Sequence, residues 1–476
     1  MSKSTNKTAA SASDGQNASG QNTSGQNKPA QENPNHHQLI RWFRQATPYI
    51  NAHRGKTFMV MLSGEAVAHP NIRNIVNDIA LLNSLGIRLV VIHGVRAQLD
   101  NKLAQQNITS TFVRDMRVSD KATMDAAIEA SSLVRSQLET RLSMGLSNSP
   151  MHGARVRVAS ANVITARPAG IIDGIDLQHT GLVRKIDTVA INTLLEMGNV
   201  VLLSPLGYSP TGETFSLAYE QVASEIATAL KADKLIAFSE ADGIYNADGE
   251  LQRELNPATA KQLLAPSKSN IQVQQQHGPE LIRCIETAVH SVEAGVPRAH
   301  LMSYRSDGAL LQELFTVDGA GTLILSANFE TIRAANADDV PAIIDIISPL
   351  EEQGVLVKRE RDKLEDEINH FTVVEREGLI IALAALYPYK NGSIGEIACI
   401  VTHPDYRNGS RGATLLAELE KSAKAMGLDM VFVLTTQTSH WFIENGFNES
   451  SLDALPEEKQ SLYNYQRNSK VLSKKL

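Results

Sequence analysis

The chain has 476 residues, a formal net charge of −7, 42% hydrophobic residues and 20% charged residues. This is ordinary globular composition for two or three domains, at a prior of roughly 150 residues each. The mild acidity argues against a basic surface for nucleic acid, and no apolar run reaches the roughly 18 residues that would span a membrane. Cys284 and Cys399 are the only cysteines, which excludes a disulfide framework and favours a reducing cytoplasm.

Residues 1–35 are rich in Ser, Asn, Gln and Gly and repeat the tetrapeptide Ser-Gly-Gln-Asn. Such a segment buries too little apolar surface to fold, so we expect a disordered tail. It has no apolar stretch typical of a secretory signal and no Arg typical of a transit peptide. Residues 39–44 then begin a short amphipathic helix ahead of the first strand.

Short apolar strands alternate with helices over the next 250 residues or so. Continuous apolar strands in this order predict a mostly parallel sheet covered on both faces, with ligands at the carboxyl ends of the strands. The predicted strands are 58–62, 88–92, 200–203, 235–238 and 299–302. The predicted helices are 72–85, 95–105, 124–141, 187–197, 220–230 and 280–294.

Two predicted strand ends carry glycine, in Ser63-Gly64-Glu65 and in His93-Gly94-Val95-Arg96. These loops resemble the phosphate-holding loops of the amino acid kinase family, and of acetylglutamate kinase in particular. The resemblance implies a kinase-like domain over residues 36–325. The kinase lysine position is occupied by Met61, and a second phosphate-binding lysine is replaced by Arg283. Phosphoryl transfer depends on cations placed around the migrating charge, so we predict a kinase fold without kinase activity.

The segments 300–303 and 308–322 resemble the arginine-binding signature of arginine-inhibited acetylglutamate kinases and synthases. The resemblance implies that Glu313 binds a guanidinium in a bidentate pair. His300 and the carbonyls around Gly319 would hold the rest of the ligand. Spacing alone favours a different interpretation, in which Glu313 is a solvated helix charge and His300 a satisfied histidine at a strand end.

The remaining residues, 330–476, predict a second α/β domain. The predicted strands are 331–335, 371–375, 380–386, 394–402 and 430–434, and the predicted helices are 340–350, 362–369, 413–426 and 440–445. Residues 394–416 form an apolar strand, a turn at Pro404, a Gly/Ser/Arg loop and the start of an amphipathic helix. This order points backbone N–H groups and a helix N-terminus at one place, which suits a pyrophosphate.

This stretch resembles the acetyl-CoA loop of the GNAT acetyltransferase superfamily, although Ser410 stands where the first loop glycine is expected. The resemblance implies that the central strands of the sheet separate and that the pantetheine arm pairs with an exposed strand edge. The residues implied in cofactor binding are Cys399, Ile400, Val401, Arg407, Ser410, Arg411, Gly412 and Ala413.

Acetyl transfer to an amino acid requires an amine, with a pKa of roughly 8, to lose a proton. Glu396 is a lone carboxylate in an apolar strand and is the predicted base, although a strand Glu is also typical of a structural ion pair. Trp441-Phe442 fills the place of the usual proton-donating Tyr, so the hydroxyl of Thr435 is the substitute candidate. Arg359 and Arg467, with Lys459 as a weaker candidate, would bind the two carboxylates of glutamate; a charge run such as 358–361 is otherwise typical of a solvated face.

From about residue 39 to its end, the chain resembles bacterial N-acetylglutamate synthases of the long, two-domain kind. The resemblance implies acetyl transfer from acetyl-CoA to L-glutamate in arginine biosynthesis, inhibition by L-arginine, a homohexamer and a cytoplasmic location. It also implies that the initial helix grips a neighbouring subunit, whereas the sequence alone favours packing on its own sheet. No metal site and no permanent cofactor are expected. The alternatives are a bifunctional synthase and kinase, and an arginine sensor whose acetyltransferase domain is silent.

Overall fold

The computed structural model describes residues 34–144, 152–153, 155–246, 248–264, 278–316, 318–326, 330–376, 378–389, 393–407, 411–461, 463–465 and 467–476. The chain divides into two compact units, residues 1–45 and 46–476. The predicted tail lies outside the described residues except for Pro34 and Asn35, which begin α1 (Pro34–His53), a 20-residue helix. None of the described helices is long and apolar enough to cross a membrane.

An eight-stranded sheet organises the kinase-like part of the chain, in the order β14-β16-β15-β13-β1-β2-β10-β5. Every neighbouring pair is parallel except β15 and β16, which run antiparallel. This agrees with the mostly parallel sheet that the apolar strands predicted. The strands are β1 (Thr57–Leu62), β2 (Arg88–His93), β5 (Arg157–Ala159), β10 (Asn199–Leu203), β13 (Lys234–Ser239), β14 (Glu254–Leu255), β15 (Arg298–Ser303) and β16 (Thr322–Leu325).

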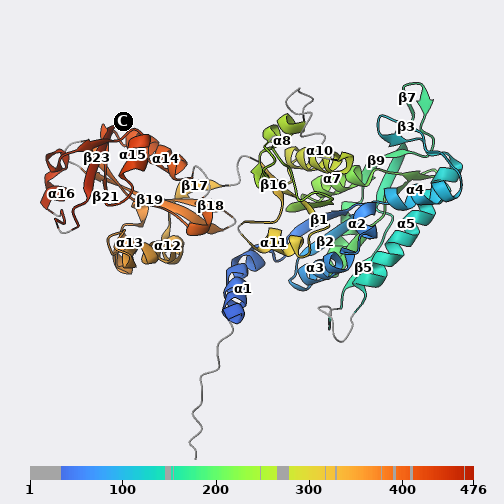
Figure 1. Cartoon of the computed structure of the whole chain (residues 1–476), viewed down its shortest axis with the longest axis horizontal. Coiled ribbons are helices and arrows are strands. Elements are labelled where there is room, and N and C mark those ends of the chain that lie inside the picture. The colour runs from blue at the N-terminus through green and yellow to red at the C-terminus, as the bar shows by residue number, and fades with distance from the viewer. Residues whose placement is uncertain are drawn as a thin grey trace, which may run out of the picture. The chain divides into compact units, whose positions relative to one another are not determined.

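Helices cover both faces of this sheet (Figure 1). One buried cluster joins alternate strand residues to α7 and α10, and a second joins the opposite strand residues to α3, α5 and α11. Three helices begin at side-chain caps, in which Ser63, Asp120 and Asp187 accept a backbone N–H of the first turn. The helices are α2 (Gly64–Ala68), α3 (Ile72–Ser84), α4 (Arg96–Gln105), α5 (Lys121–Leu142), α6 (Thr188–Glu196), α7 (Tyr219–Ala229), α8 (Pro257–Leu264), α10 (Pro279–Glu293) and α11 (Ala309–Phe315).

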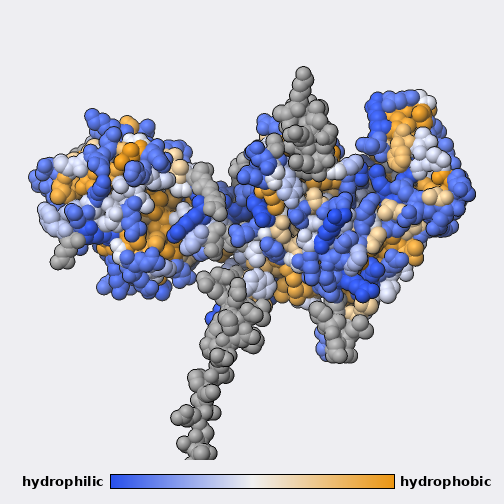
Figure 2. Space-filling model, in the orientation of Figure 1, coloured by the Kyte–Doolittle hydropathy of each residue, from blue (hydrophilic) through white to orange (hydrophobic). Residues whose placement is uncertain are grey.

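A smaller sheet and two hairpins were not predicted. The sheet has the order β12-β11-β6-β9, and the hairpins pair β3 with β4 and β7 with β8. Hydrophobic surface is visible around β7 (Figure 2), where Ile171 and Ile175 are exposed. These strands are β3 (Phe112–Val113), β4 (Met116–Arg117), β6 (Ile164–Pro168), β7 (Ile171–Ile172), β8 (Ile175–Asp176), β9 (Gly181–Ile186), β11 (Leu206–Tyr208) and β12 (Thr214–Ser216).

The C-terminal part is a seven-stranded sheet with the order β17-β18-β19-β20-β21-β23-β22. One core cluster packs α14 and α15 on one face, and another packs α12 and α13 on the other. The strands are β17 (Thr331–Ala334), β18 (Phe371–Arg376), β19 (Leu379–Tyr389), β20 (Ile394–Thr402), β21 (Met430–Thr435), β22 (Asn448–Ser450) and β23 (Lys470–Lys475). The helices are α12 (Val340–Glu352), α13 (Arg361–Asp366), α14 (Arg411–Ala425), α15 (Ser439–Glu444) and α16 (Glu457–Ser461).

Candidate acetyl-transfer and regulatory sites

The central strands β20 and β21 pair only at their beginnings. Parallel pairing joins Ile394 to Met430 and continues to Glu396 and Phe432. Beyond these pairs, β21 continues to pair with β23 on its other side. The two strands therefore separate after Glu396, and an extended ligand arm can add to the edge that this exposes.

A β-bulge lies on β20 just beyond the separation point. Cys399 has a positive φ of 55°, and the register with β19 shifts so that Ala385 faces Ala398 while Leu383 faces Val401. A bulge leaves the extra residue unpaired and redirects its backbone groups. The candidate residues Cys399, Ile400 and Val401 thus form a local irregularity where backbone N–H groups leave the regular ladder.

Glu396 is buried, with 8% of its side chain exposed. Its Oε2 accepts a hydrogen bond from the hydroxyl of Tyr389 at 3.0 Å, and the ammonium of Lys459 lies 2.7 Å from the same oxygen. The carboxylate is thus both a candidate base and a member of an ion pair, as the two interpretations of the sequence required. Burial and then the charge of Glu396 raise the pKa of Tyr389 well above its usual value, so this hydroxyl stays protonated and donates.

Lys459 does not stand free for a substrate carboxylate in this structure, because its ammonium is held by Glu396. The role of Lys459 in glutamate binding stays a prediction, and a cation already paired with a buried carboxylate would bind a second carboxylate less strongly. Tyr389 was missed because it lies beyond the predicted strand, which ended at Leu386; a proline such as Pro388 is unusual inside a strand. In the structure β19 continues through Pro388, which faces Gly395.

The helix after the predicted pyrophosphate loop begins at Arg411, two residues earlier than predicted. Arg411, Gly412 and Ala413 form the first turn of α14. The first N–H groups of a helix have no partner within it, so the cofactor-binding role of these three residues stays a prediction. Gly412 lies close to the ring of Trp441, where an added Cβ would meet the indole at 3.3 Å. Ser410 lies outside the described residues.

The side chains of Arg411 and Arg407, the two arginines of this loop, have different surroundings. The guanidinium of Arg411 bonds Glu330, with Nε 2.8 Å from Oε1 and 3.0 Å from Oε2. Its Nη1 also donates to the carbonyl of Tyr406 at 3.2 Å. Arg407 is exposed. The side chain of Arg411 is therefore occupied by Glu330 and Tyr406, and its backbone N–H is the group that stays a candidate for cofactor binding.

Thr435 ends β21, as predicted. Its hydroxyl accepts the N–H of Thr438 at 3.1 Å and lies 2.9 Å from the hydroxyl of Thr438. This local turn positions the chain for α15, and it gives Thr435 a structural role beside the predicted one. Phe442 lies in the hydrophobic core of the domain and carries no hydroxyl.

Two of the predicted glutamate ligands converge on one segment. Nη1 of Arg359 donates to the carbonyl of Val357 at 3.1 Å, and the guanidinium of Arg467 donates to the carbonyl of Val355. The Nε of Arg467 is buried without a hydrogen-bond partner among the described residues. A buried unpaired donor is costly, so it is a position where an anion would be stabilised.

Arg359 is linked to the reaction strand as well. Burial raises the pKa of the Cys399 thiol to about 11, and the nearby charge of Arg359 opposes this rise. Burial lowers the pKa of Arg359, but the nearby Cys399 and Tyr387 raise it above its usual value. Tyr387 faces Glu396 across β19 and β20. The candidates Glu396, Cys399 and Arg359 therefore belong to one neighbourhood, and Arg467 joins it through the segment that contains Val355 and Val357.

His300, Glu313 and Gly319 are also brought together. Nδ1 of His300 lies 2.8 Å from Oε1 of Glu313, while Oε2 of Glu313 accepts the N–H groups of Ala320 at 2.6 Å and Gly321 at 2.9 Å. A Cβ on Gly319 would lie 2.6 Å from the same carboxylate, and its φ is 62°. The interpretation of Glu313 as a solvated charge is wrong, because only 5% of its side chain is exposed.

The protonation states of His300 and Glu313 leave one ring nitrogen of His300 as an acceptor without a donor among the described residues. Burial lowers the pKa of His300 to about 4, so the ring is neutral near pH 7 and donates from Nδ1. Burial alone would raise the pKa of Glu313, but the hydrogen bonds from His300 and from the backbone lower it to about 2. Nε2 of His300 is then a buried acceptor with no partner among the described residues, and a guanidinium N–H would satisfy it.

The surroundings of this pair depart from the predictions in two respects. The carbonyl of Gly319 already accepts a hydrogen bond from the side chain of Gln312 at 2.9 Å. The pair also lies near the beginning of β15, together with Lys234 and Arg298, which are the first residues of β13 and β15 and line the same cavity. The predicted placement at strand carboxyl ends is therefore wrong for this pair. Both cations were missed because each lies one residue before a predicted strand, 235–238 or 299–302, and no local motif marks it.

Neither of the two positions at which a kinase has a phosphate-binding lysine carries an unpaired cation. Met61 is fully buried, and Nε of Arg283 pairs with Oε1 of Glu220 at 2.9 Å. Gly94 packs against Tyr219, whose ring carbon a Cβ there would meet at 3.0 Å. A buried thioether and a neutralised guanidinium cannot stabilise the charge of a migrating phosphoryl group.

The fold and these sites define a class of protein in which a GNAT acetyltransferase domain follows a domain of the amino acid kinase kind. The amino acid kinase family matches residues 56–303, and the acetyltransferase (GNAT) family matches residues 340–447. The chain is 51% identical to an amino-acid acetyltransferase of Ectopseudomonas mendocina over 92% of this chain and 100% of the relative. It is also 51% identical to one of Pseudomonas syringae pv. tomato, over 92% and 99%. The chain belongs to this amino-acid acetyltransferase family and is an acyltransferase.

Two solved structures support the same assignment. N-acetylglutamate synthase from Neisseria gonorrhoeae complexed with coenzyme A and L-arginine is 36% identical, with a TM-score of 0.81 over 92% of this chain and 99% of that one. The same enzyme complexed with coenzyme A and N-acetyl-glutamate is 38% identical, with a TM-score of 0.58 over the same shares. The predicted fold class and family resemblance are confirmed.

Proposed function

We propose that this chain transfers the acetyl group of acetyl-CoA to the α-amino group of L-glutamate, and that L-arginine inhibits the transfer through the kinase-like domain. Residues 330–476 would be catalytic and residues 36–325 regulatory. The observation that carries the proposal is the buried carboxylate of Glu396, placed where β20 and β21 separate. The synthase relative that is complexed with coenzyme A supports acetyl-CoA as the co-substrate.

The chemistry assigned to Glu396 is removal of a proton from the glutamate ammonium, through a water molecule. Both contacts of the carboxylate involve Oε2, which leaves Oε1 to accept the bond from that water. The free amine then attacks the thioester carbonyl and a C–N bond forms. As the tetrahedral intermediate collapses, the C–S bond breaks to release the coenzyme A thiolate, and the nitrogen loses its remaining extra proton to solvent to give the amide. Thr435 is proposed to return a proton to the thiolate, and backbone N–H groups of the β20 bulge to stabilise the developing oxyanion.

Arg359 and Arg467 are proposed to bind the carboxylates of glutamate. Support comes from their attachment to one segment and from the buried, unpaired Nε of Arg467. A guanidinium matches the geometry of a carboxylate and can donate two parallel hydrogen bonds to it. The synthase relative complexed with N-acetyl-glutamate supports this choice of acceptor.

Release of free thiol from acetyl-CoA tests the function directly. We expect release that depends on glutamate and is suppressed by arginine. Glu396→Gln should lower kcat by about 10²- to 10⁴-fold, which is the usual contribution of a positioned base, while Thr435→Val should cost less. Thiol release without glutamate dependence would contradict the acceptor. No thiol release at all would favour the silent arginine sensor, and phosphorylation of N-acetylglutamate by ATP would favour the bifunctional alternative.

We further propose a homohexamer in the cytoplasm. Ile40, Trp42 and Phe43 on α1 are exposed, which supports an arm that packs on a second copy of this chain. Cys284 and Cys399 are free and buried, which suits a reducing compartment. Light scattering coupled to size exclusion should give six times the mass of the chain, and Phe43→Asp should lower it.

A further inference from the structure

Two tyrosines on β19, Tyr387 and Tyr389, lie beside the proposed base. Alternate side chains of a strand point to the same face of the sheet, so the two rings share one face. In the register with β20, Tyr387 is directly opposite Glu396 and Tyr389 is opposite Ile394. Residues that lie opposite each other in an antiparallel pair also share a face. Glu396 and both tyrosines therefore lie on the same face of the acetyltransferase sheet.

The hydroxyls of the two tyrosines bond different carboxylates. Tyr389 donates to Oε2 of Glu396 at 3.0 Å, and Tyr387 donates to Oε2 of Glu367 at 2.9 Å. Burial, and then the hydrogen bond to Glu367, raise the pKa of Tyr387 well above its usual value. The Tyr387 hydroxyl therefore stays protonated near neutral pH, and its hydrogen is directed to Glu367.

Tyr387 also shares a side-chain hydrogen bond with Arg359, the proposed ligand of a glutamate carboxylate. Because the hydroxyl hydrogen is directed to Glu367, the hydroxyl oxygen is the acceptor for a guanidinium N–H. Nη1 of Arg359 donates to the carbonyl of Val357 at 3.1 Å. The guanidinium is thus held both by its own loop and by the sheet, and it has further N–H groups for a ligand.

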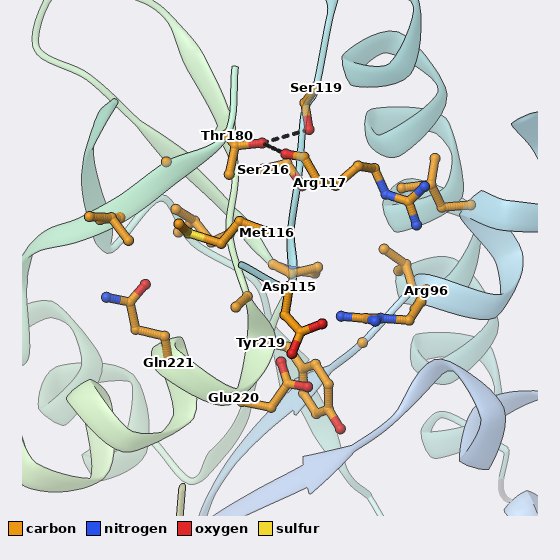
Figure 3. Close-up of a pocket in the computed structure, with 18 of the residues that line it drawn as sticks. Arg96, Asp115, Met116, Arg117, Ser119, Thr180, Ser216, Tyr219, Glu220 and Gln221 are labelled. Atoms are coloured by element: carbon orange, nitrogen blue, oxygen red, sulfur yellow. Dashed lines mark hydrogen bonds between the residues drawn. The ribbon is translucent and has the colours of Figure 1, made fainter. Parts of the chain in front are cut away.

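The hydroxyl of Tyr387 stands between this guanidinium and the nearest carboxylate that orients it. Among the described residues the side chain of Arg359 forms no ion pair. By contrast, Nε of Arg283 contacts Oε1 of Glu220 directly at 2.9 Å, in the first turn of α7 where Figure 3 labels Glu220. A carboxylate in direct contact offsets the charge of a guanidinium. At Arg359 the intervening hydroxyl leaves that charge for a carboxylate of the substrate.

The ring of Tyr387 is held in place by the segment that carries its hydrogen-bond acceptor. The ring of His370 packs on it with the centroids 4.9 Å apart. Glu367 and His370 both lie in the short segment between α13 and β18. Packing and hydrogen bonding together therefore fix the position of the hydroxyl, as is required of a group that supports a binding residue.

We propose that Tyr387 is a positioning residue that holds the guanidinium of Arg359 at a fixed distance from the base Glu396. The cross-strand pair of Tyr387 with Glu396 sets this distance, so one carboxylate of the acceptor and its amino group are placed together. The inference rests on the proposed function, in which Arg359 binds a carboxylate of glutamate. It adds that the affinity for the acceptor depends on a hydroxyl that acts through Arg359.

Tyr387→Phe tests this role, because it removes the hydroxyl and keeps the ring. We expect the KM for glutamate to rise by about fivefold or more, with kcat changed by less than about twofold. Tyr389→Phe should give the opposite pattern, a lower kcat with a nearly unchanged KM, because its hydroxyl bonds Glu396. Lys363→Gln is the matched control and should change neither value, since the exposed ammonium of Lys363 lies 3.7 Å from the other oxygen of Glu367.

A double-mutant cycle separates positioning from a general structural role. In the Arg359→Ala background, Tyr387→Phe should raise the KM for glutamate by less than about twofold more, because the residue through which it acts is gone. Glu367→Ala is a second variant that removes the acceptor of the hydroxyl, and it should raise the KM in the same direction as Tyr387→Phe. Thermal melting of each variant shows that it folds.

The unmodified chain is assayed first, by release of free thiol from acetyl-CoA. Release that does not depend on glutamate would overturn both the proposed function and the role of Tyr387. Where release depends on glutamate, three results overturn the role of Tyr387 alone. They are an unchanged KM in the Tyr387→Phe variant, full additivity with Arg359→Ala, and the same kinetic change in both Phe variants.

Discussion

The ammonium of Lys459 lies 2.7 Å from Oε2 of Glu396, within a part of the sheet where only 8% of the glutamate side chain is exposed. Burying a carboxylate is costly unless it is paired and hydrogen-bonded. Lys459 is therefore a positioning residue for the proposed base, and Tyr389 fixes the same oxygen from the other strand.

Lys459→Gln should lower kcat by about tenfold or more, because Oε2 of Glu396 loses the charged partner that holds the carboxylate in place. Lys459→Arg should restore most of the activity. Lys470→Gln is the matched control, since Lys470 pairs with Glu449 at the surface. A raised KM for glutamate with an unchanged kcat would instead return Lys459 to the substrate site.

Arg359→Ala should raise the KM for glutamate by about 10- to 100-fold, the loss expected for hydrogen bonds to a charged group. The KM for acetyl-CoA should change far less. Arg361→Ala serves as the control, because Arg361 lies two residues away, is exposed and pairs only with Glu365 on its own helix. Steady-state kinetics with each substrate varied in turn will separate the effect on the KM for glutamate from the effect on the KM for acetyl-CoA. If the larger effect falls on acetyl-CoA, Arg359 does not bind the acceptor.

The sequence predicted the long helices with a regular apolar period, and it named most of the residues that the structure brings together at the candidate sites. Helices such as α3 and α10 have strong apolar faces. The predicted bounds differ from the structure by one residue at one end of α3 and by one residue at each end of α10. The sheet of β6, β9, β11 and β12 was missed because its strands are short and carry charges, as in Arg184 and Lys185 of β9. Alternation over three to six residues gives little periodic signal.

Pairing partners were the least predictable part of the sites. Glu396 was identifiable as a lone strand carboxylate, but Lys459 is 63 residues further along the chain, and no local pattern connects the two. Likewise, the ion pair of Arg411 with Glu330 redirects a guanidinium that the loop pattern assigned to phosphate. Such contacts depend on tertiary packing, which overrides local propensity.

Glu313→Ala should leave acetyl transfer intact and weaken inhibition by arginine. Removing the carboxylate leaves the N–H groups of Ala320 and Gly321 without their acceptor, so this variant also loosens the loop. Glu313→Gln keeps an acceptor but removes the charge, and it should weaken inhibition by about tenfold or more if a guanidinium pairs there. Inhibition curves measured at fixed glutamate will test both. Full inhibition of the Gln variant would remove Glu313 from the arginine site.

His93 should make the folded chain less stable as the pH falls below neutrality. Burial lowers the pKa of His93 from 6.5 to about 4, so the folded state resists a proton that the unfolded state accepts. The stabilisation is complete above pH 6.5 and is lost as the pH falls toward 4. At pH 5 the loss is about 2 kcal/mol, from 1.36 kcal/mol per pH unit. Asp78 and Glu280, whose pKa values burial raises to about 7, act in the opposite direction.

The comparison that isolates this effect is between the unmodified chain and His93→Gln. The variant cannot gain a proton at this position, so its stability should fall less between pH 7.5 and pH 5, by about 2 kcal/mol. The carboxylates with raised pKa values are common to both proteins and cancel in the difference. Calorimetric melting at each pH provides the measurement. Equal pH dependence of the two proteins would mean that His93 is protonated alike in the folded and unfolded chains.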